Sequence, residues 1–306
     1  TSEMLDTPNL GRRNLIINGA MSINQRAATS GITSGYFVDR FQLSGVSASA
    51  VITSSTPTEF PTAITVSATS GNPIILQKIE SKMVQHLSGK VVTVSFYAKN
   101  ISNATTLYTS LQYAGSADNF GSTTTISEQN LGNLTTDWVK YTASWTVPAG
   151  GLNGLSLNIL CAGSSTFTMG VTGVQLEVGD TATDFEHRSY GEELSLCQRY
   201  YELIGFGNIA LAESGSTYVH NLNYKVEKRA VPTISLFTTS NIRIRQFGVS
   251  DRDAASPSAS STAGSKNGGY IKVTGFNGIG GAATAAGIGY TTSSEAGNIF
   301  YISAEL

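Results

Sequence analysis

The stretch from Phe167 to Glu202, FTMGVTGVQLEVGDTATDFEHRSYGEELSLCQRYYE, decides how this chain is organised. It begins with the apolar alternation of a β-strand and breaks at Gly179. It resumes over Gly191–Glu202 with the spacing of a helix, the clearest helical pattern in the sequence. The stretch therefore predicts that a long β-domain ends here and that a short helical joint leads into a second unit.

The predicted helix has one apolar stripe and an acidic first turn. Leu194, Cys197 and Tyr201 recur at i, i+3 and i+7. Glu192 and Glu193 lie in the first turn, where the helix dipole favours carboxylates. We expect the stripe to pack at an interface, either between the two domains or between subunits.

Composition is typical of a β-rich globular protein. The chain has 306 residues, enough for two domains, and 40% of them are hydrophobic. Charged residues make up only 13%, whereas soluble domains usually have about 25%. The net charge of −2 creates no field that would attract nucleic acid, and no apolar run approaches the ~20 residues of a membrane-spanning helix. Neither nucleic-acid binding nor membrane insertion is therefore expected.

The cysteines and the N-terminal sequence fit folding in a reducing cytoplasm. Cys161 lies in an apolar strand pattern and Cys197 on the predicted helix. We interpret both as buried free thiols, with a disulfide as the alternative. The sequence TSEMLDTPNLGRRN at the N-terminus lacks the apolar core of a signal peptide. We therefore expect the protein to be assembled in the cytoplasm.

Strand signals separated by turn residues run along most of the chain. We predict an all-β protein with an N-terminal arm (1–13), an antiparallel jelly-roll sandwich (14–188), a linker helix (189–202) and a smaller C-terminal β-sandwich domain (203–306). Strands of the jelly roll are expected at residues 15–19, 36–44, 50–53, 63–69, 73–80, 90–100, 106–115, 138–148, 155–161 and 167–178. Strands of the second domain are expected at residues 205–211, 217–229, 233–237, 241–250, 269–276, 287–292 and 298–306. The Ser-, Ala- and Gly-rich segment 251–269 is expected to be a mobile surface loop.

No assembled catalytic or metal-binding pattern is present in the sequence. The three histidines are far apart, neither cysteine stands at a ligand spacing from them, and no serine lies in a Gly-x-Ser-x-Gly elbow. An acidic run lies between the last jelly-roll strand and the helix, and we interpret it as a solvated turn or a subunit contact rather than a catalytic pair. Its members are Glu177, Asp180, Asp184 and Glu186. We predict no catalytic residues, no bound metal and no cofactor.

Aromatic and amide side chains are the best candidates for binding a ligand. Along residues 138–148, alternate positions from Val139 to Val147 form the predicted core face, which leaves Trp138 and Lys140 on the opposite face. Tyr108 and Gln112 share a side of another strand. A flat ring beside amide and charged groups suits a sugar, so these residues are candidate glycan ligands. The alternative is that Trp138 only covers an edge of the sandwich.

Several segments resemble a group of bacteriophage virion proteins, often labelled tail-fibre or receptor-binding proteins, whose jelly roll is similar to that of carbohydrate-binding modules. The matching segments include RNLIINGAM, YFVDRF, GKVVTVSFYAKN, GVQLEVGDTATDFEHRSYGEEL and CQRYYE, together with the dipeptide Gln25-Arg26 and the later motif RAVPTI. They cover most of residues 12–235.

The resemblance implies a non-enzymatic protein of the virion surface that forms a homotrimer and contacts other virion proteins. A tail-fibre or tail-tip adhesin that binds host glycan is the first hypothesis, and a capsid decoration protein anchored by its arm is the second. A secreted glycan-active enzyme is a third. Arg12 and Arg13, which end the arm, are candidate interface residues in either attachment. Related modules often hold a structural calcium through an acid on the last strand, a position that Glu177 occupies here.

Overall fold

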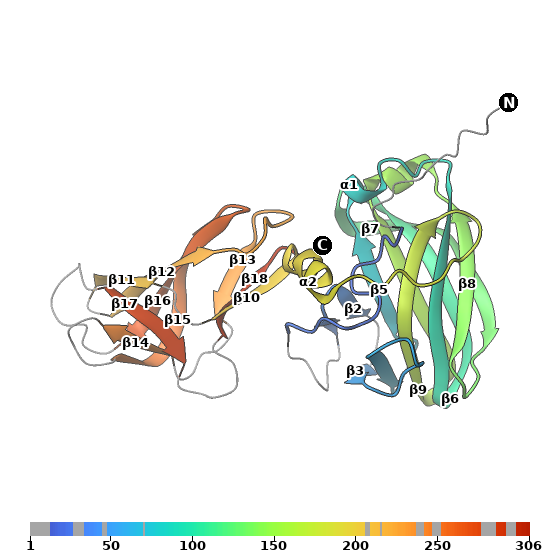
Figure 1. Ribbon diagram of the computed structural model, residues 1–306, viewed down its shortest axis with the longest axis horizontal. Coiled ribbons are helices and arrows are strands. Elements are labelled where there is room, and N and C mark those ends of the chain that lie inside the picture. The colour runs from blue at the N-terminus through green and yellow to red at the C-terminus, as the bar shows by residue number, and fades with distance from the viewer. Residues whose placement is uncertain are drawn as a thin grey trace. The chain divides into compact units, whose positions relative to one another are not determined.

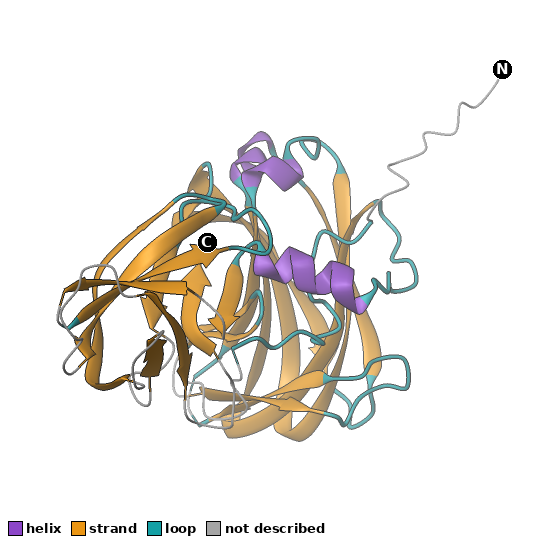
Figure 2. Cartoon of the chain, turned by 60° about the vertical axis from the view of Figure 1, so that its left-hand side comes forward, coloured by secondary structure: helices purple, strands orange, loops and turns teal. Residues whose placement is uncertain are grey.

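The computed structural model describes residues 13–26, 34–44, 48–69, 71–205, 209–214, 216–236, 242–246, 252–276, 286–291 and 298–306. The chain forms two compact units, one of residues 1–193 with Leu306 and one of residues 194–305, so the boundary lies inside helix α2 (Tyr190–Gln198) (Figure 1). Both units consist mainly of strands, as the sequence predicts (Figure 2). None of the described helices is long and apolar enough to cross a membrane.

The first unit is an antiparallel sheet folded into two layers. Its strands are β1 (Gly35–Val38), β2 (Phe41–Ser44), β3 (Ala48–Thr53), β4 (Ala63–Ala68), β5 (Ile74–Ile79), β6 (Val91–Ser116), β7 (Asn119–Asn133), β8 (Val139–Thr146) and β9 (Leu155–Val178). Two short helical turns, α1 (Ser81–Val84) and η1 (Ala149–Asn153), connect strands. The long strands β6 and β9 each contribute one half to either layer.

Layer 1 consists of β1, β2, β5, β7, the second half of β6 and the first half of β9. Layer 2 consists of β3, β4, β8, the first half of β6 and the second half of β9. The register of β6 shifts between Asn100 and Thr106, and Asn103 adopts a positive φ of 53° there. This irregularity changes which side chains of β6 face the core. Before it, residues with even numbers such as Val94 face the core; after it, residues with odd numbers such as Leu107 do.

One hydrophobic core fills the space between the layers. Leu111 and Ile159 of layer 1 and Val94 and Trp145 of layer 2 belong to the same buried cluster. The indole Nε1 of Trp145 also donates a hydrogen bond of 3.1 Å to the carbonyl of Ser127 on β7, and so joins the two edge strands β7 and β8. The core face predicted for residues 138–148 is confirmed, except that Val139 at its start is 38% exposed.

Several strand predictions for the first unit differ from the structure, among them the strands expected at residues 155–161 and 167–178, which form the single strand β9. Residues 15–19 are not a strand, because Asn18 takes a positive φ of 62° and the backbone forms bends beside β9. Residues 36–44 form two strands joined by a turn, where Arg40 has a φ of 72°. The 15-residue strand β7 was not predicted, since its polar, Thr- and Ser-rich sequence lacks a regular apolar alternation.

The second unit contains a closed barrel and a small sheet instead of the predicted sandwich. The barrel has the strand order β11 (Ile209–Ser214), β12 (Thr217–Asn223), β16 (Gly268–Phe276), β15 (Arg252–Gly264), β14 (Ile242–Gln246) and β17 (Ala286–Thr291). The sheet has the order β10 (Tyr201–Gly205), β18 (Asn298–Ser303) and β13 (Thr233–Leu236). A hydrophobic cluster that includes Tyr218, Val273 and Phe300 joins the two parts.

Two further predictions for this region were wrong. Residues 252–264 form strand β15 rather than a mobile loop, because their backbone pairs with both β14 and β16. Helix α2 ends at Gln198, and Tyr201 begins strand β10, where it pairs with Ser303. Tyr201 therefore does not belong to a helical stripe.

Candidate functional site

The outer face of layer 1 carries a group of neutral polar side chains on three adjacent strands. Register places Gln112 of β6 opposite Thr125 of β7 and Ser156 of β9. One row further along, Ser110 of β6 lies opposite Asn158 of β9. We call these residues, together with Thr123 and Tyr108, the polar face.

Hydrogen bonds hold the polar face in one arrangement. The carboxamide of Gln112 accepts a bond from Thr123 Oγ1 at 2.9 Å and donates one to Thr125 Oγ1 at 3.2 Å. Asn158 Nδ2 donates to Ser110 Oγ at 3.2 Å, and Ser156 Oγ donates to Asn158 Oδ1 at 3.1 Å. Because a neighbour orients each of these hydroxyl and amide groups, binding of a ligand would cost little entropy for ordering them.

Tyr108 supplies an aromatic ring at one end of the polar face, next to Ser110 along β6. It lies on the same side of β6 as Ser110 and Gln112, and it is half-buried, opposite Asn130 of β7 and Leu160 of β9. Thr123 and Thr125 are exposed, whereas Ser110, Ser156 and Asn158 are almost completely buried. The face therefore combines exposed hydroxyl groups, amides and an aromatic ring, which is the chemistry that sugar hydroxyls and sugar ring faces require.

Charged groups are few on this face. Glu128 is exposed on β7, in the row of Ser110. Lys78 of β5 lies opposite Ser156, and its ammonium donates to the carbonyl of Leu306, a residue of the first unit, at 2.9 Å. The polar face thus offers little attraction to a strongly charged ligand.

The structure separates the four predicted glycan ligands into two pairs. Tyr108 and Gln112 share the polar face of layer 1. Trp138 and Lys140 instead lie on layer 2, beside the first half of β6. The four residues therefore cannot form one site.

Lys140 and Trp138 have structural partners on layer 2. Lys140 Nζ donates to the carbonyl of Thr183 at 2.8 Å. The indole of Trp138 covers Gly170, where an added Cβ would approach Cη2 to 2.8 Å, and the ammonium of Lys99 lies 5.1 Å from its ring centre. Whether Trp138 binds a ligand stays a prediction.

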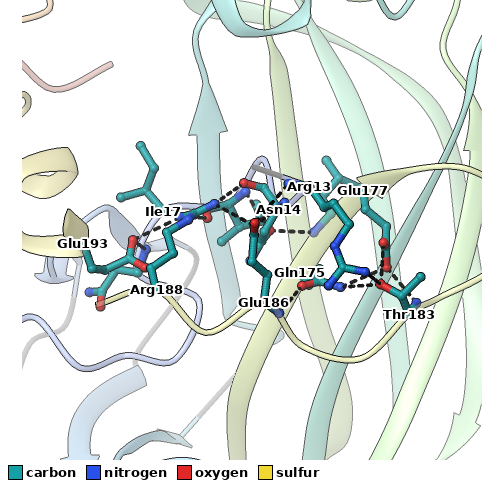
Figure 3. Close-up of polar contacts among 12 residues, drawn as sticks. Arg13, Asn14, Ile17, Gln175, Glu177, Thr183, Glu186, Arg188 and Glu193 are labelled. Atoms are coloured by element: carbon teal, nitrogen blue, oxygen red, sulfur yellow. Dashed lines mark hydrogen bonds and ion pairs between the residues drawn. The ribbon is translucent and has the colours of Figure 1, made fainter. Parts of the chain in front are cut away.

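The acidic run after β9 holds the N-terminal segment of the first unit. Figure 3 shows Glu186 next to both Asn14 and Gln175 of β9, with Arg188 on the side of Glu193. Glu186 accepts backbone N–H bonds from Arg13 at 3.2 Å and Asn14 at 2.8 Å, and its own N–H donates to Gln175 Oε1 at 2.8 Å.

Arg188 and Glu193 extend this network. Arg188 Nη1 donates to the carbonyl of Ile16 at 3.0 Å and pairs with Glu193 at 3.3 Å, while Nη2 pairs with Glu186 at 3.4 Å. Glu193 in turn accepts the backbone N–H of Asn18 at 2.6 Å. The acids thus stabilise the first unit itself. This corrects the interpretation of Glu186 as part of a solvated turn, whereas Asp180 and Asp184 are exposed and a subunit contact of the run stays a prediction.

The residues around Glu177 do not fit a metal site. Glu177 is 3% exposed, and its carboxylate accepts bonds from Gln175 Nε2 at 2.9 Å, Thr183 N at 2.8 Å and Thr183 Oγ1 at 2.7 Å. These partners are donors that compete with a cation rather than further oxygen ligands for calcium. Among the described residues, no group of three or more His, Cys, Asp and Glu side chains has the geometry of a metal site.

The candidate interface residues are distributed over several places. Arg12 lies outside the described residues. The guanidinium of Arg13 donates to Thr183 Oγ1 at 3.0 Å. Cys197 is fully buried and Leu194 is half-buried on α2, whereas Tyr201 stacks on Tyr301 within the second unit. A role of these residues between subunits stays a prediction.

Both cysteines are free and buried, as interpreted from the sequence. Burial raises the pKa of the Cys161 thiol to about 11, which keeps it protonated and unreactive.

The sequence did not identify most of the polar face. Thr123 and Thr125 lie on the strand that was not predicted, and Ser110, Ser156 and Asn158 look like ordinary strand residues. The abundance of Thr between residues 119 and 133 was the available signal, because Thr favours strands.

Comparison with known proteins shows a partial structural likeness. No family model and no curated protein sequence matches the chain. A domain of bacteriophage CBA120 tailspike protein 4, described as enzymatically active, is 16% identical with a TM-score of 0.39, and the match covers 54% of this chain and 21% of the tailspike chain. The C-terminal family 22 carbohydrate-binding module of Clostridium thermocellum Xyn10B is 16% identical with a TM-score of 0.37, covering 52% of this chain and 98% of the module.

A third solved structure, TmCBM61 in complex with β-1,4-galactotriose, is 12% identical with a TM-score of 0.36 and covers 55% of this chain and all of the module. These values describe a distant likeness over about half of the chain. The function must therefore be argued from the residues of the site.

Proposed function

We propose that this protein binds a glycan on the polar face of layer 1 and does not cleave it. The observation that carries the proposal is the hydrogen-bonded array of Gln112, Thr123 and Thr125, on the side of the sheet that also carries Tyr108 further along β6. Each hydroxyl and amide in the array keeps a further donor or acceptor for a sugar hydroxyl. The ring of Tyr108 offers an apolar surface for the C–H side of a sugar. The scarcity of charge favours a neutral glycan.

The absence of catalysis is part of the same proposal. General acid–base cleavage of a glycosidic bond requires two carboxyl groups that face each other across the substrate. In the described part of the polar face, Glu128 is the one carboxylate. Glu177 and Glu186, which the sequence places close together, already accept hydrogen bonds from the backbone N–H groups of Thr183 and Asn14, respectively.

We further propose that the protein belongs to the surface of a bacteriophage virion. The support is the sequence resemblance, whose most specific segments are RNLIINGAM and GVQLEVGDTATDFEHRSYGEEL. These segments meet in the network of Asn14, Glu186 and Arg188. Their residues therefore support the architecture of the unit and lie outside the polar face. An adhesin of the tail is the first assignment, and assembly as a homotrimer accompanies it.

Capsid decoration is the second assignment. The sequence contains neither coiled-coil heptads nor fibre repeats, so this chain does not by itself build a long shaft. Cryo-electron microscopy of the intact virion distinguishes the two assignments. Density for this protein on the tail supports the adhesin, and density on the capsid shell rules it out.

Mutation of the polar face tests glycan binding. We expect Tyr108→Ala and Gln112→Ala each to weaken binding to the best ligand of a glycan array by at least about tenfold, or ~1.4 kcal/mol. Trp138→Ala on layer 2 is the matched control and should bind as the unchanged protein does. Equal loss in Trp138→Ala, with full binding in the other two variants, would place the site on layer 2 instead. Release of new reducing ends from the bound glycan would contradict the non-enzymatic assignment.

A further inference from the structure

His220 occupies a central place in the core of the second unit. It lies in the middle of β12, opposite Ala210 of β11 and Ile271 of β16. Its side chain is completely buried, and its ring meets Phe300 of β18 edge to face, with 5.0 Å between the ring centres. Because β12 belongs to the barrel and β18 to the three-stranded sheet, His220 lies where these two parts of the unit pack together.

The imidazole of His220 has no polar partner among the described residues. Neither Nδ1 nor Nε2 has a hydrogen-bond partner there. A neutral imidazole then leaves one donor and one acceptor unsatisfied, whereas a protonated ring would bury a positive charge as well. The neutral form is therefore the less costly one in this core.

The described groups packed around His220 supply no counter-charge. The buried residues of the neighbouring strands are apolar: Ala210 and Ala212 on β11, Ile271 and Val273 on β16, and Phe300 and Ile302 on β18. On β12 itself the buried titratable neighbour is Tyr218. Glu202 of β10 is buried too, but it is paired with Lys228, whose ammonium also lies 5.2 Å from the ring of Tyr224.

Protonation of His220 is consequently coupled to opening of this core. Burial lowers the pKa of His220 from 6.5 to about 4. When the core opens, His220 binds a proton with its ordinary pKa, whereas in the closed core it does so only near pH 4. The stability of the closed core is therefore at its maximum above pH 6.5 and falls as the pH decreases towards 4. Below pH 4 both states are protonated and the loss levels off.

We propose that His220 is an acid-responsive element that loosens the second unit in mildly acidic surroundings. This inference concerns the second unit and does not depend on glycan binding by the first. An acidic environment would weaken the packing of β12 against β18 while the first unit keeps its structure. The barrel and its sheet are thus the part of the protein whose order responds to the acidity of the surroundings.

Hydrogen exchange of the full-length protein at pH 7.5 and pH 5.0, followed by mass spectrometry, tests the proposal. After correction for the intrinsic exchange rate, we expect the opening equilibrium in β12 and β18 to rise by about 30-fold at pH 5.0. Peptides from β6 in the first unit serve as the internal reference and should change much less. Equal protection of β12 and β18 at the two pH values would overturn the proposal.

Two variants identify the group responsible. His220→Phe keeps a buried ring without a titratable nitrogen and should abolish the rise, whereas His86→Phe, at an exposed histidine of the first unit, should retain it. A rise that persists in His220→Phe would assign the effect to another group and contradict the proposal. If His220→Phe does not fold, nuclear magnetic resonance titration of the unchanged protein decides, because an imidazole of His220 that is protonated at pH 6 in the folded state is incompatible with this mechanism.

Discussion

Arg188 shows how much of the first unit depends on single polar side chains. Its side chain is 4% exposed and contacts the carbonyl of Ile16 and the carboxylates of Glu186 and Glu193. The planar guanidinium reaches these partners in different directions, which an ammonium group does less well. Arg188, which follows β9 in the chain, thereby holds the N-terminal segment around Ile16, more than 170 positions earlier.

Removal of this side chain should destabilise the first unit strongly. We expect Arg188→Ala to lower its free energy of unfolding by about 3 kcal/mol, because two carboxylates and a carbonyl lose a buried cation. In a unit of this size the midpoint of thermal unfolding should then fall by about 6–12 °C. Fluorescence of Trp138 and Trp145, both in the first unit, reports the transition. Lys82→Ala, at an exposed lysine of α1, is the control and should leave the midpoint unchanged; an equal midpoint in Arg188→Ala would refute the role of the network.

The partners of individual side chains were the least predictable feature. Parity along the chain correctly placed Tyr108 with Gln112, because the strand period is fixed by the backbone. The partner of Lys140 is the carbonyl of Thr183, 43 positions away, and no local pattern indicates such a contact. Glu186 looked solvated for the same reason, because its donors, the N–H groups of Arg13 and Asn14, come from the N-terminal segment.

At the scale of elements, the second half of β9 depends on an irregularity at Gly173. This residue has a φ of 62°, in the left-handed region, and a Cβ there would lie 2.5 Å from the ring of Phe60. The ring of Phe60 packs in turn against Phe185, at 5.0 Å, and Tyr97, at 5.4 Å. The glycine thus lets an aromatic cluster cover the outer side of layer 2.

A methyl group at this position should disturb the strand. We expect Gly173→Ala to lower the free energy of unfolding of the first unit by about 2–4 kcal/mol, through backbone strain and the clash with Phe60. The matched control is Gly191→Ala in the first turn of α2, where a Cβ meets open space. There alanine should be neutral or slightly stabilising. Chemical unfolding followed by tryptophan fluorescence compares the two variants, and equal stability would show that the strand relaxes around the methyl group.

Most elements follow from the sequence, while their lengths do not. The positions of β4, β5 and β8 match the apolar alternation closely. The two strands expected at residues 90–100 and 106–115 are one strand, β6, since a register shift near Asn103 continues the pairing where the sequence suggests a turn. β15 was missed because its Ser- and Ala-rich sequence lacks the bulky residues that usually indicate a strand.

At the scale of the whole molecule, each unit has its own hydrophobic core and its own buried ion-pair network. In the second unit, Lys228 contacts Glu202 and donates to the carbonyl of Gln198 near the C-terminus of α2. Burial lowers the pKa of Lys228, and the hydrogen bond with Glu202 opposes that effect. The segments CQRYYE and RAVPTI meet near this pair, where the N–H of Arg229 donates to the carbonyl of Arg199 at 3.0 Å.

Loss of the Glu202 charge should therefore affect the second unit alone. We expect Glu202→Gln to lower the free energy of unfolding of that unit by about 3–5 kcal/mol, because the buried ammonium of Lys228 loses its counter-charge. Hydrogen exchange in β10 and β12 measures the loss. Tryptophan fluorescence of the first unit is the control and should show an unchanged transition. A matching shift in that transition would mean that the two units unfold together.

The division into two β-rich units could be predicted from the single stretch between Phe167 and Glu202, because in it a strand pattern is followed directly by a helix pattern. The closed barrel could not, since closure depends on pairing between β11 and β17, which are more than 70 residues apart. Likewise, the polar face depends on pairing of β6 with both β7 and β9.

The central claim is that the polar face of layer 1 binds a neutral glycan. The most direct measurement is a glycan-array experiment with the full-length protein, its Gln112→Ala variant and its Trp138→Ala variant. We predict that the unchanged protein and Trp138→Ala bind the same neutral glycans, and that Gln112→Ala loses them. Binding that survives in Gln112→Ala, or no binding of the unchanged protein to any glycan, would contradict the account.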